Sequence, residues 1–340
     1  MFKRCFHGRN AGSYGYGLLL LLSFILPCRA QQGSAAGFIM EHVTDAHDWH
    51  FATVGQYHVT LPLPIILYSR DRGMECFSSA RFYDHQQHTV PFRGYRMVGN
   101  TICCVDANRS VVDLSITKNI AAMLGSMLLL VAVLLVAARK YQRTACLVPS
   151  GFIAFVDLIV SFIKDEIAIP NIGRRHYERF LPYLLTVFCF IWLNNLLGLL
   201  PGGANVTGNI SVTLVLAAFT IVLTIINGNK QYWSHIFKPA EVPKWLWPIM
   251  VPIEMIGIFT KFFSLMVRLF ANITAGHIIL LSIIGLVFSL KSIWVGFAVT
   301  LPFSTFMFLL KLVVAVLQAY VFTLLSAIYL GQAVAEKGCH

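Results

Sequence analysis

Charged side chains are scarce in this chain, and their scarcity excludes an ordinary soluble domain. Asp, Glu, Lys and Arg make up 12% of the 340 residues, whereas soluble proteins contain about 25%. Hydrophobic residues make up 57%, and several uncharged runs reach the ~20 residues that a helix needs to cross a bilayer. The sequence therefore predicts an all-α polytopic membrane protein.

The sequence also lacks the short motifs of nucleotide and metal chemistry. It contains no P-loop, GxSxG, HExxH or CxxC pattern, so we expect neither a catalytic site nor a cofactor. The histidines and aspartates within residues 42–50 resemble a metal-binding cluster. Because no supporting ligand spacing accompanies them, they favour a hydrated loop or a partner surface, and we expect no metal site.

The N-terminal third of the chain precedes the first expected span. Residues 1–30 have the basic start, short apolar core and small-residue end of a secretory signal peptide. An uncleaved anchor is the alternative, which the short core disfavours. Residues 31–117 are polar and mixed, and we expect a small extracytoplasmic domain with short strands, such as residues 57–63. A disulfide is permitted there, its pairing left open among Cys76, Cys103 and Cys104.

Apolar runs divide the remaining chain, residues 118–335, into five expected spans. They cover about residues 119–138, 181–200, 210–227, 248–290 and 293–334. The last two exceed an upright span, so we expect long, tilted, hairpin-like helices. The charged segment 150–172 fits a helix lying along the membrane surface. Lysines and arginines beside the spans place the mature N-terminus outside and the C-terminus in the cytoplasm. This topological role explains the net charge of +11 without nucleic acid.

One arginine lies deep inside the fourth expected span. At the bilayer centre an arginine costs at least ~2.5–3.5 kcal/mol, and such a residue marks an ion or proton path by default. Because its pKa exceeds ~12, Arg268 is a permanent positive charge. At helical spacing Glu254, Lys261 and Asn272 share its face, whereas His277 points to the opposite side.

Less specific interpretations of these polar residues stay open. Glu254 and Lys261, seven residues apart, are also compatible with a structural ion pair. Asn272 and Gln318 are of a type that joins neighbouring membrane helices. His277 is compatible with a buried core histidine, although an ordinary pKa near ~6.5 suits a proton relay.

Four ordered segments resemble subunit a of F-type ATP synthase. They are residues 194–201 (NNLLGLLP), 205–214 (NVTGNISVTL), 268–277 (RLFANITAGH) and 317–325 (LQAYVFTLL). Their order and spacing agree with the family over about residues 150–332. The N-terminal extension, with DAHDWH at residues 45–50, resembles forms from Bacteroidetes-type bacteria.

The resemblance implies a stator subunit that forms two proton half-channels against a ring of c subunits. It implies subunit b of the peripheral stalk, other ATP synthase subunits and membrane lipid as partners, in the cell inner membrane. Arg268 matches the arginine that faces the ring. The half-channel positions are matched by Asn195, Glu254, Asn272, His277 and Gln318.

One residue departs from the family pattern. Lys311 lies seven residues before Gln318, where relatives with histidine at the His277 position usually carry glutamate. An ammonium there repels a protonated histidine and cannot accept a proton as a carboxylate does, unless burial deprotonates it. We include Lys311 among the residues expected in proton translocation.

Two other functions remain to be tested. A secondary ion transporter with its own substrate pocket predicts transport by the isolated chain. A membrane anchor or sensor predicts that the outer domain is essential while loss of the Arg268 charge is tolerated. Neither accounts for the four ordered segments.

Overall fold

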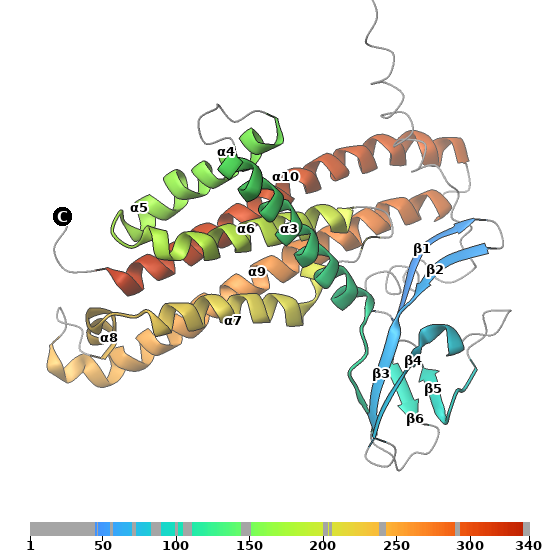
Figure 1. Cartoon of the computed structure of the whole chain (residues 1–340), viewed down its shortest axis with the longest axis horizontal. Helices are drawn as coiled ribbons and strands as arrows, with labels where there is room; N and C mark the ends of the chain where they lie inside the picture. Colours follow the sequence, from blue (N-terminus) through green and yellow to red (C-terminus); the bar gives the residue numbers. More distant parts are fainter. Residues whose placement is uncertain are drawn as a thin grey trace, which may run out of the picture.

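A β-rich unit precedes a bundle of helices in the computed structural model of this chain (Figure 1). The structure describes residues 45, 47–54, 57–69, 73–82, 90–98, 101–104, 111–143, 151–199, 203, 206–237, 243–289 and 293–335. The expected signal segment, residues 1–30, lies outside the described residues.

The β-unit consists of short antiparallel strands, as expected for this segment. Its described strands are β1 (Asp48–Val54), β2 (Tyr57–Pro62), β3 (Pro64–Ser69), β4 (Gly73–Ser78), β5 (Tyr95–Val98), β6 (Thr101–Cys104) and β7 (Val111–Asp113). They form the pairs β1-β2 and β5-β6 and a three-stranded sheet in the order β4-β3-β7. Alternating residues of that sheet, among them Ile65, Leu67 and Phe77, pack with Tyr95 into a small core.

Aspartate side chains tie the β-unit to the first long helix, α3 (Lys118–Arg143). Asp45 accepts a hydrogen bond from Thr117 Oγ1 at 2.8 Å and another from the backbone N–H of Asn119 at 3.1 Å. Because the first N–H groups of a helix have no partner within the helix, Asp45 caps α3 from a distant part of the sequence.

A second aspartate, Asp113, closes the end of β7. Its carboxylate accepts hydrogen bonds from His47 Nε2 and from the backbone N–H of Ser115, each at 2.9 Å. Burial alone raises the pKa of Asp113, but the bonds from Ser115 and His47 outweigh burial and hold the pKa below its ordinary value. Two members of the segment that resembles a metal cluster, Asp45 and His47, thus have structural roles.

The helical bundle follows without further strands in the described residues. After α3 it contains α4 (Phe152–Phe162), the π-helical η2 (Ile163–Ala168), α5 (Ile169–Ile172), α6 (Tyr177–Leu199), the 3-10 turn η3 (Val206–Gly208), α7 (Ile210–Ile226), α8 (Lys230–Phe237), α9 (Trp247–Ser289) and α10 (Ile293–Val334). Figure 1 shows α6, α7, α9 and α10 running lengthwise through the bundle, with α3 crossing them obliquely.

Four helices of the described part are long and apolar enough to cross a membrane. They are Lys118–Tyr141 in α3, Tyr177–Leu199 in α6, Trp247–Leu280 in α9 and Thr300–Val334 in α10. The expectation of a helical, multi-pass membrane protein is confirmed. The other expected span corresponds to α7, which has 17 residues and is shorter than these four.

The segment expected along the membrane surface is helical but interrupted. Its π-helical part buries Ile163, Ile167 and Ala168 in the core that α6 and α10 share. At the same place α10 approaches α5 very closely, because a Cβ at Gly331 would overlap the carbonyl group of Asn171. A glycine is therefore required there. The orientation of this segment relative to the membrane stays a prediction.

Candidate functional site

Two long neighbouring helices, α9 and α10, carry most of the polar residues expected inside the membrane. They pack against each other over much of their length, and α10 also packs along α6. Both helices are apolar over most of their length, and a few polar residues interrupt them. Lys261 and Asn272 of α9 donate hydrogen bonds to Gln332 and Gln318 of α10, so these polar side chains lie between the two helices.

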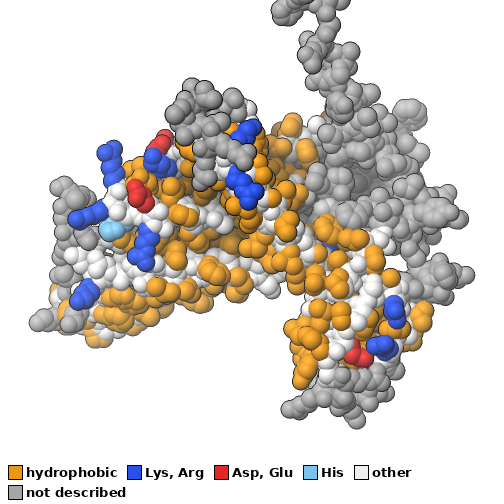
Figure 2. Space-filling model, viewed as in Figure 1, with side chains coloured by type: hydrophobic (Ala, Val, Ile, Leu, Met, Phe, Trp, Pro, Cys, Tyr) orange, Lys and Arg blue, Asp and Glu red, His pale blue; other side chains and the backbone are white. Residues whose placement is uncertain are grey.

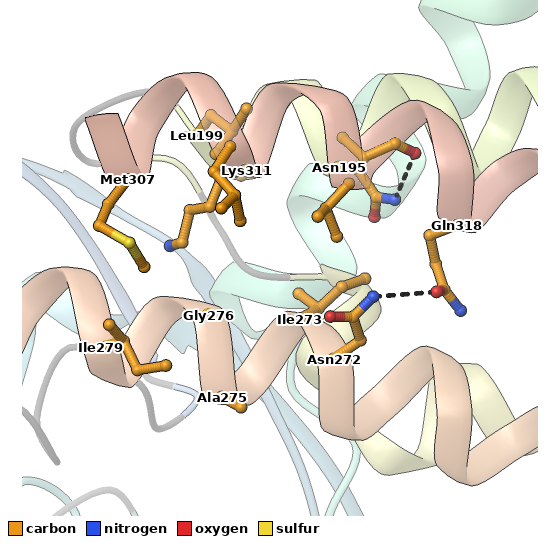
Figure 3. A pocket seen from close by; sticks show the side chains of 14 residues that line it. Asn195, Leu199, Asn272, Ile273, Ala275, Gly276, Ile279, Met307, Lys311 and Gln318 are labelled. Carbon is orange, nitrogen blue, oxygen red and sulfur yellow. Dashed lines mark hydrogen bonds between the residues drawn. The ribbon is translucent and has the colours of Figure 1, made fainter. Parts of the chain in front are cut away.

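A cavity of about 190 Å³ lies where α6, α9 and α10 meet (Figure 3). Its lining is largely apolar, with four polar exceptions from three helices. These are Asn195 of α6, Asn272 of α9, and Lys311 and Gln318 of α10. Since a water molecule occupies about 30 Å³ of liquid, this volume is enough for several waters next to polar partners.

Amide groups connect the helices around this cavity. Asn272 Nδ2 donates to Gln318 Oε1 at 3.0 Å and joins α9 to α10. Asn195 Nδ2 donates to the carbonyl of Ala315 at 3.3 Å, while Asn195 Oδ1 accepts from Thr207 Oγ1 at 2.8 Å. The helix-joining interpretation of Asn272 and Gln318 is thus confirmed, and it is compatible with their place at a cavity wall.

Lys311 has a different environment from the amides. Its side chain is only 8% exposed, and Nζ has no hydrogen-bond partner among the described residues. Figure 3 shows the side chain reaching from α10 across the cavity toward α9. A Cβ at Gly276 would lie 3.2 Å from Lys311 Cε, so the glycine leaves room for the lysine stem.

A second polar group lies nearer the start of α9. Lys261 Nζ donates to Gln332 Oε1 at 3.1 Å and lies 5.5 Å from the ring centre of Tyr329. Glu254, two turns earlier on α9, acts electrostatically on Tyr232 of α8. The pKa of Tyr232 is raised above its ordinary value. Burial is the larger cause, and the charge of Glu254 is the smaller one.

Arg268 lies between these two groups along α9. It follows Glu254 by 14 residues, about 21 Å of helix, and precedes Asn272 by one turn. Leu265, Met266 and Leu269 are buried in the bundle, but the side chain of Arg268 is exposed. It forms no hydrogen bond or ion pair with the described residues, and its charge acts on Tyr329.

The structure brings together four of the seven expected site residues, namely Asn195, Asn272, Lys311 and Gln318. Glu254 and Arg268 lie elsewhere on α9. His277 belongs to α9, next to the cavity residue Gly276, but its side chain lies outside the described part.

Sequence reasoning missed several polar partners, namely Thr207, Tyr329 and Gln332. Thr207 was detectable, because it lies within one of the four ordered segments. Gln332 and Tyr329 follow Gln318 on α10 without a local signal that points to Lys261. Among the described residues no group of three or more His, Cys, Asp or Glu side chains is arranged to hold a metal ion.

These features define a multi-pass membrane protein with polar and charged side chains on its long helices. Comparison with known proteins gives the family. A family model described as ATP synthase A chain matches residues 120–331, so the chain belongs to this family. A second model, a domain of unknown function (DUF8433), matches residues 38–122, which include the β-unit.

Curated relatives agree with this assignment. The chain is 49% identical over 233 residues to ATP synthase subunit a 2 of Prosthecochloris aestuarii, covering 66% of this chain and 71% of the relative. It is 49% identical over 235 residues to ATP synthase subunit a 2 of Chlorobaculum tepidum, covering 67% and 66%. ATP synthase subunit a of an Anaeromyxobacter species is 42% identical over 235 residues, covering 67% and 56%. The family expected from the four segments is confirmed, and with it the role of a non-catalytic membrane subunit of ATP synthase.

Proposed function

We propose that α9 and α10 form two proton half-channels against a ring of c subunits, and that Arg268 separates them. The half-channels couple proton flow to rotation of the ring and to ATP synthesis elsewhere in the complex. The supporting observation is the position of Arg268, exposed and without a hydrogen bond or ion pair to the described residues, between two polar groups on one helix.

The cost of an exposed guanidinium in a membrane supports a partner that carries a carboxylate. Lipid contact is unfavourable for Arg268 by several kcal/mol, and the described part of the chain supplies no carboxylate to it. A neighbouring subunit with a membrane-embedded carboxylate supplies the missing counter-charge. The guanidinium stabilises the ionised carboxylate and so favours proton loss at that point.

Rotation follows from the same electrostatics. A protonated ring carboxylate is neutral and enters lipid, whereas an ionised one does not. A fixed cation also repels a proton that moves along the α9 path directly, so protons travel on the ring. Each proton that crosses gains about 2.3 kcal/mol per 100 mV of membrane potential.

The cavity is the outer half-channel in this proposal. Its polar residues are Asn195, Asn272, Lys311 and Gln318, and His277 is expected beside them. The group near the start of α9, with Glu254, lies on the path to the cytoplasm. An isolated buried ammonium is costly without a counter-charge, so we assign Lys311 the role of a neutral amine that accepts and releases a proton.

Charge distribution supports the orientation. Figure 2 shows that lysine and arginine side chains gather at the end of the bundle away from the β-unit. Arg174 and Arg175 before α6 and Lys230 at the start of α8 are exposed. Because cytoplasmic ends carry excess Lys and Arg, the β-unit lies outside and the C-terminus in the cytoplasm. We propose location in the cell inner membrane, with a fifth span formed by α7.

Substitution of Arg268 tests the proposal. Arg268→Ala and Arg268→Lys are both expected to abolish ATP-driven proton pumping in inverted membrane vesicles. Alanine removes the positive charge, and lysine replaces the guanidinium by a compact, titratable charge. The matched control is Thr260→Ala, which removes an exposed hydroxyl that donates to the carbonyl of Ile256 in the same helix. Subunit b, the c ring and the remaining subunits are expected to co-purify in all variants. Normal pumping by Arg268→Ala would refute the role.

A further inference from the structure

The three-stranded sheet of the β-unit has an uncharged apolar face. Side chains alternate along its strands, so that Ile65, Leu67 and Phe77 enter the core and their neighbours point outward. None of the outward residues of β3, β4 and β7 is charged. We call this surface the outer sheet face, formed mainly by Ile66, Tyr68, Met74, Cys76, Val112 and Leu114.

Strand register makes these residues continuous. Tyr68 is paired with Met74 on one side and with Val112 on the other, which gives one row across the sheet. Met74 is 69% exposed, Val112 55% and Tyr68 48%. Ile66 is paired with Cys76 and accepts a backbone hydrogen bond from Leu114, which extends the face by a second row. Such contiguous apolar surface marks an interaction site.

Two described arginines, Arg81 and Arg93, lie on the opposite side of this core. The ring of Phe92 packs against the ring of Phe77 on the core side of the sheet, with ring centres 5.5 Å apart. The guanidinium groups of Arg81 and Arg93 lie over Phe92 at 5.4 and 5.6 Å. Arg81 and Arg93 are thus separated from the outer sheet face by the core of the β-unit.

The outer sheet face is adjacent to the membrane. Asp113 ends β7 and Lys118 begins α3, so at most about 17 Å of extended chain separates the sheet from the first span. Ile120 and Leu124 of α3 are exposed and continue the apolar surface of Leu114 along the chain. Figure 1 places β3 toward the helices and β5 and β6 away from them. Figure 2 shows hydrophobic side chains gathered on that same side of the β-unit.

We propose that the outer sheet face lies on the lipid surface of the outer leaflet. Its residues suit the interface, because an exposed tyrosine offers an apolar ring and a polar hydroxyl at headgroup depth. The two hydrogen bonds of the Asp45 cap hold the β-unit at the start of α3. The inference rests on the membrane topology and is independent of the proton path.

Site-specific fluorescence in the assembled complex tests the contact. The native cysteines are replaced, and one new cysteine is introduced as Met74→Cys on the outer sheet face or as Arg81→Cys on the opposite side of the core. Each carries the environment-sensitive probe nitrobenzoxadiazole in vesicles of phosphatidylcholine and phosphatidylglycerol. Proton pumping shows that both labelled complexes are intact.

The expected result is that lipids with a nitroxide near the headgroup quench the probe at position 74 at least threefold more than the probe at position 81. Iodide in solution is expected to show the opposite order. Equal iodide quenching at both positions would overturn the proposal, because it places the face in water. Protection of position 74 from both quenchers would also overturn it, since a protein would then cover the face.

Discussion

The substitution Lys311→Met tests two properties of the buried amine, namely its effect on stability and its role in proton conduction. Methionine has a flexible, unbranched side chain of similar length, so it fills the space of the lysine stem beside Gly276. A buried polar group without a partner costs about 1–3 kcal/mol. The 8% exposure of Lys311 and its unpartnered Nζ lead us to expect a gain of that size. The melting temperature is therefore expected to rise in Lys311→Met.

Proton flux is expected to move in the other direction. Methionine carries no proton, so passive proton conduction through membranes stripped of the catalytic sector is expected to fall at least tenfold. Lys311→Glu restores a titratable group and is expected to preserve or raise conduction. Leu312→Met, at an exposed neighbouring position, is the matched control and changes neither quantity.

The assays are thermal unfolding of the purified complex and the decay of an imposed pH gradient in vesicles. Wild-type conduction by Lys311→Met would refute a relay role for the amine. Complete loss of conduction in Lys311→Glu would show that the path needs a positive charge at this position. A lower melting temperature in Lys311→Met would refute the statement that the amine is destabilising.

Two further predictions concern the cavity and the β-unit. Gly276→Leu is expected to lower conduction with assembly intact, because even a Cβ lies 3.2 Å from Lys311 Cε; Gly276→Ala has a mild effect in the same assay, since the lysine end shifts easily. The depressed pKa of Asp113 stabilises the β-unit above the unfolded value near 3.8, and this contribution is lost as pH falls through the folded pKa. Hydrogen exchange between about pH 5 and pH 2 is therefore expected to show a weaker acid dependence in Asp113→Asn. An unchanged acid dependence in this variant contradicts the role of the carboxylate.

Much of the helical architecture was predictable because membrane length and apolar composition are local properties. The two expected long segments correspond to α9 and α10, and the expected strand at residues 57–63 corresponds to β2. The π-helical break after Phe162 was not predictable, since it depends on packing against α6 and α10. The expected segment 210–227 coincides with α7 (Ile210–Ile226) to within one residue, although α7 is shorter than the four helices that are long enough to cross a membrane.

Four of the seven expected site residues line the cavity, but their contacts were only partly predictable. Helical spacing placed Lys311 and Gln318 on one face of α10, and both line the cavity. Spacing within one helix carries no information about partners on another. The partner of Lys261 is Gln332, 71 positions away. Gly276 likewise has a role only because α10 brings a lysine next to it.

The arrangement along α9 explains why a long helix suits a subunit of this kind. A span of ~20 residues has room for one polar group before it reaches the membrane surface. The 43 residues of α9 place Glu254 and Lys261 before Arg268, and Asn272 and Gly276 after it. In the proposed mechanism, a proton that enters from one side meets its own polar group and then the cation. The cation is exposed while the neighbouring Leu265 and Leu269 are buried, which supports the proposal that a moving partner outside the chain continues the path.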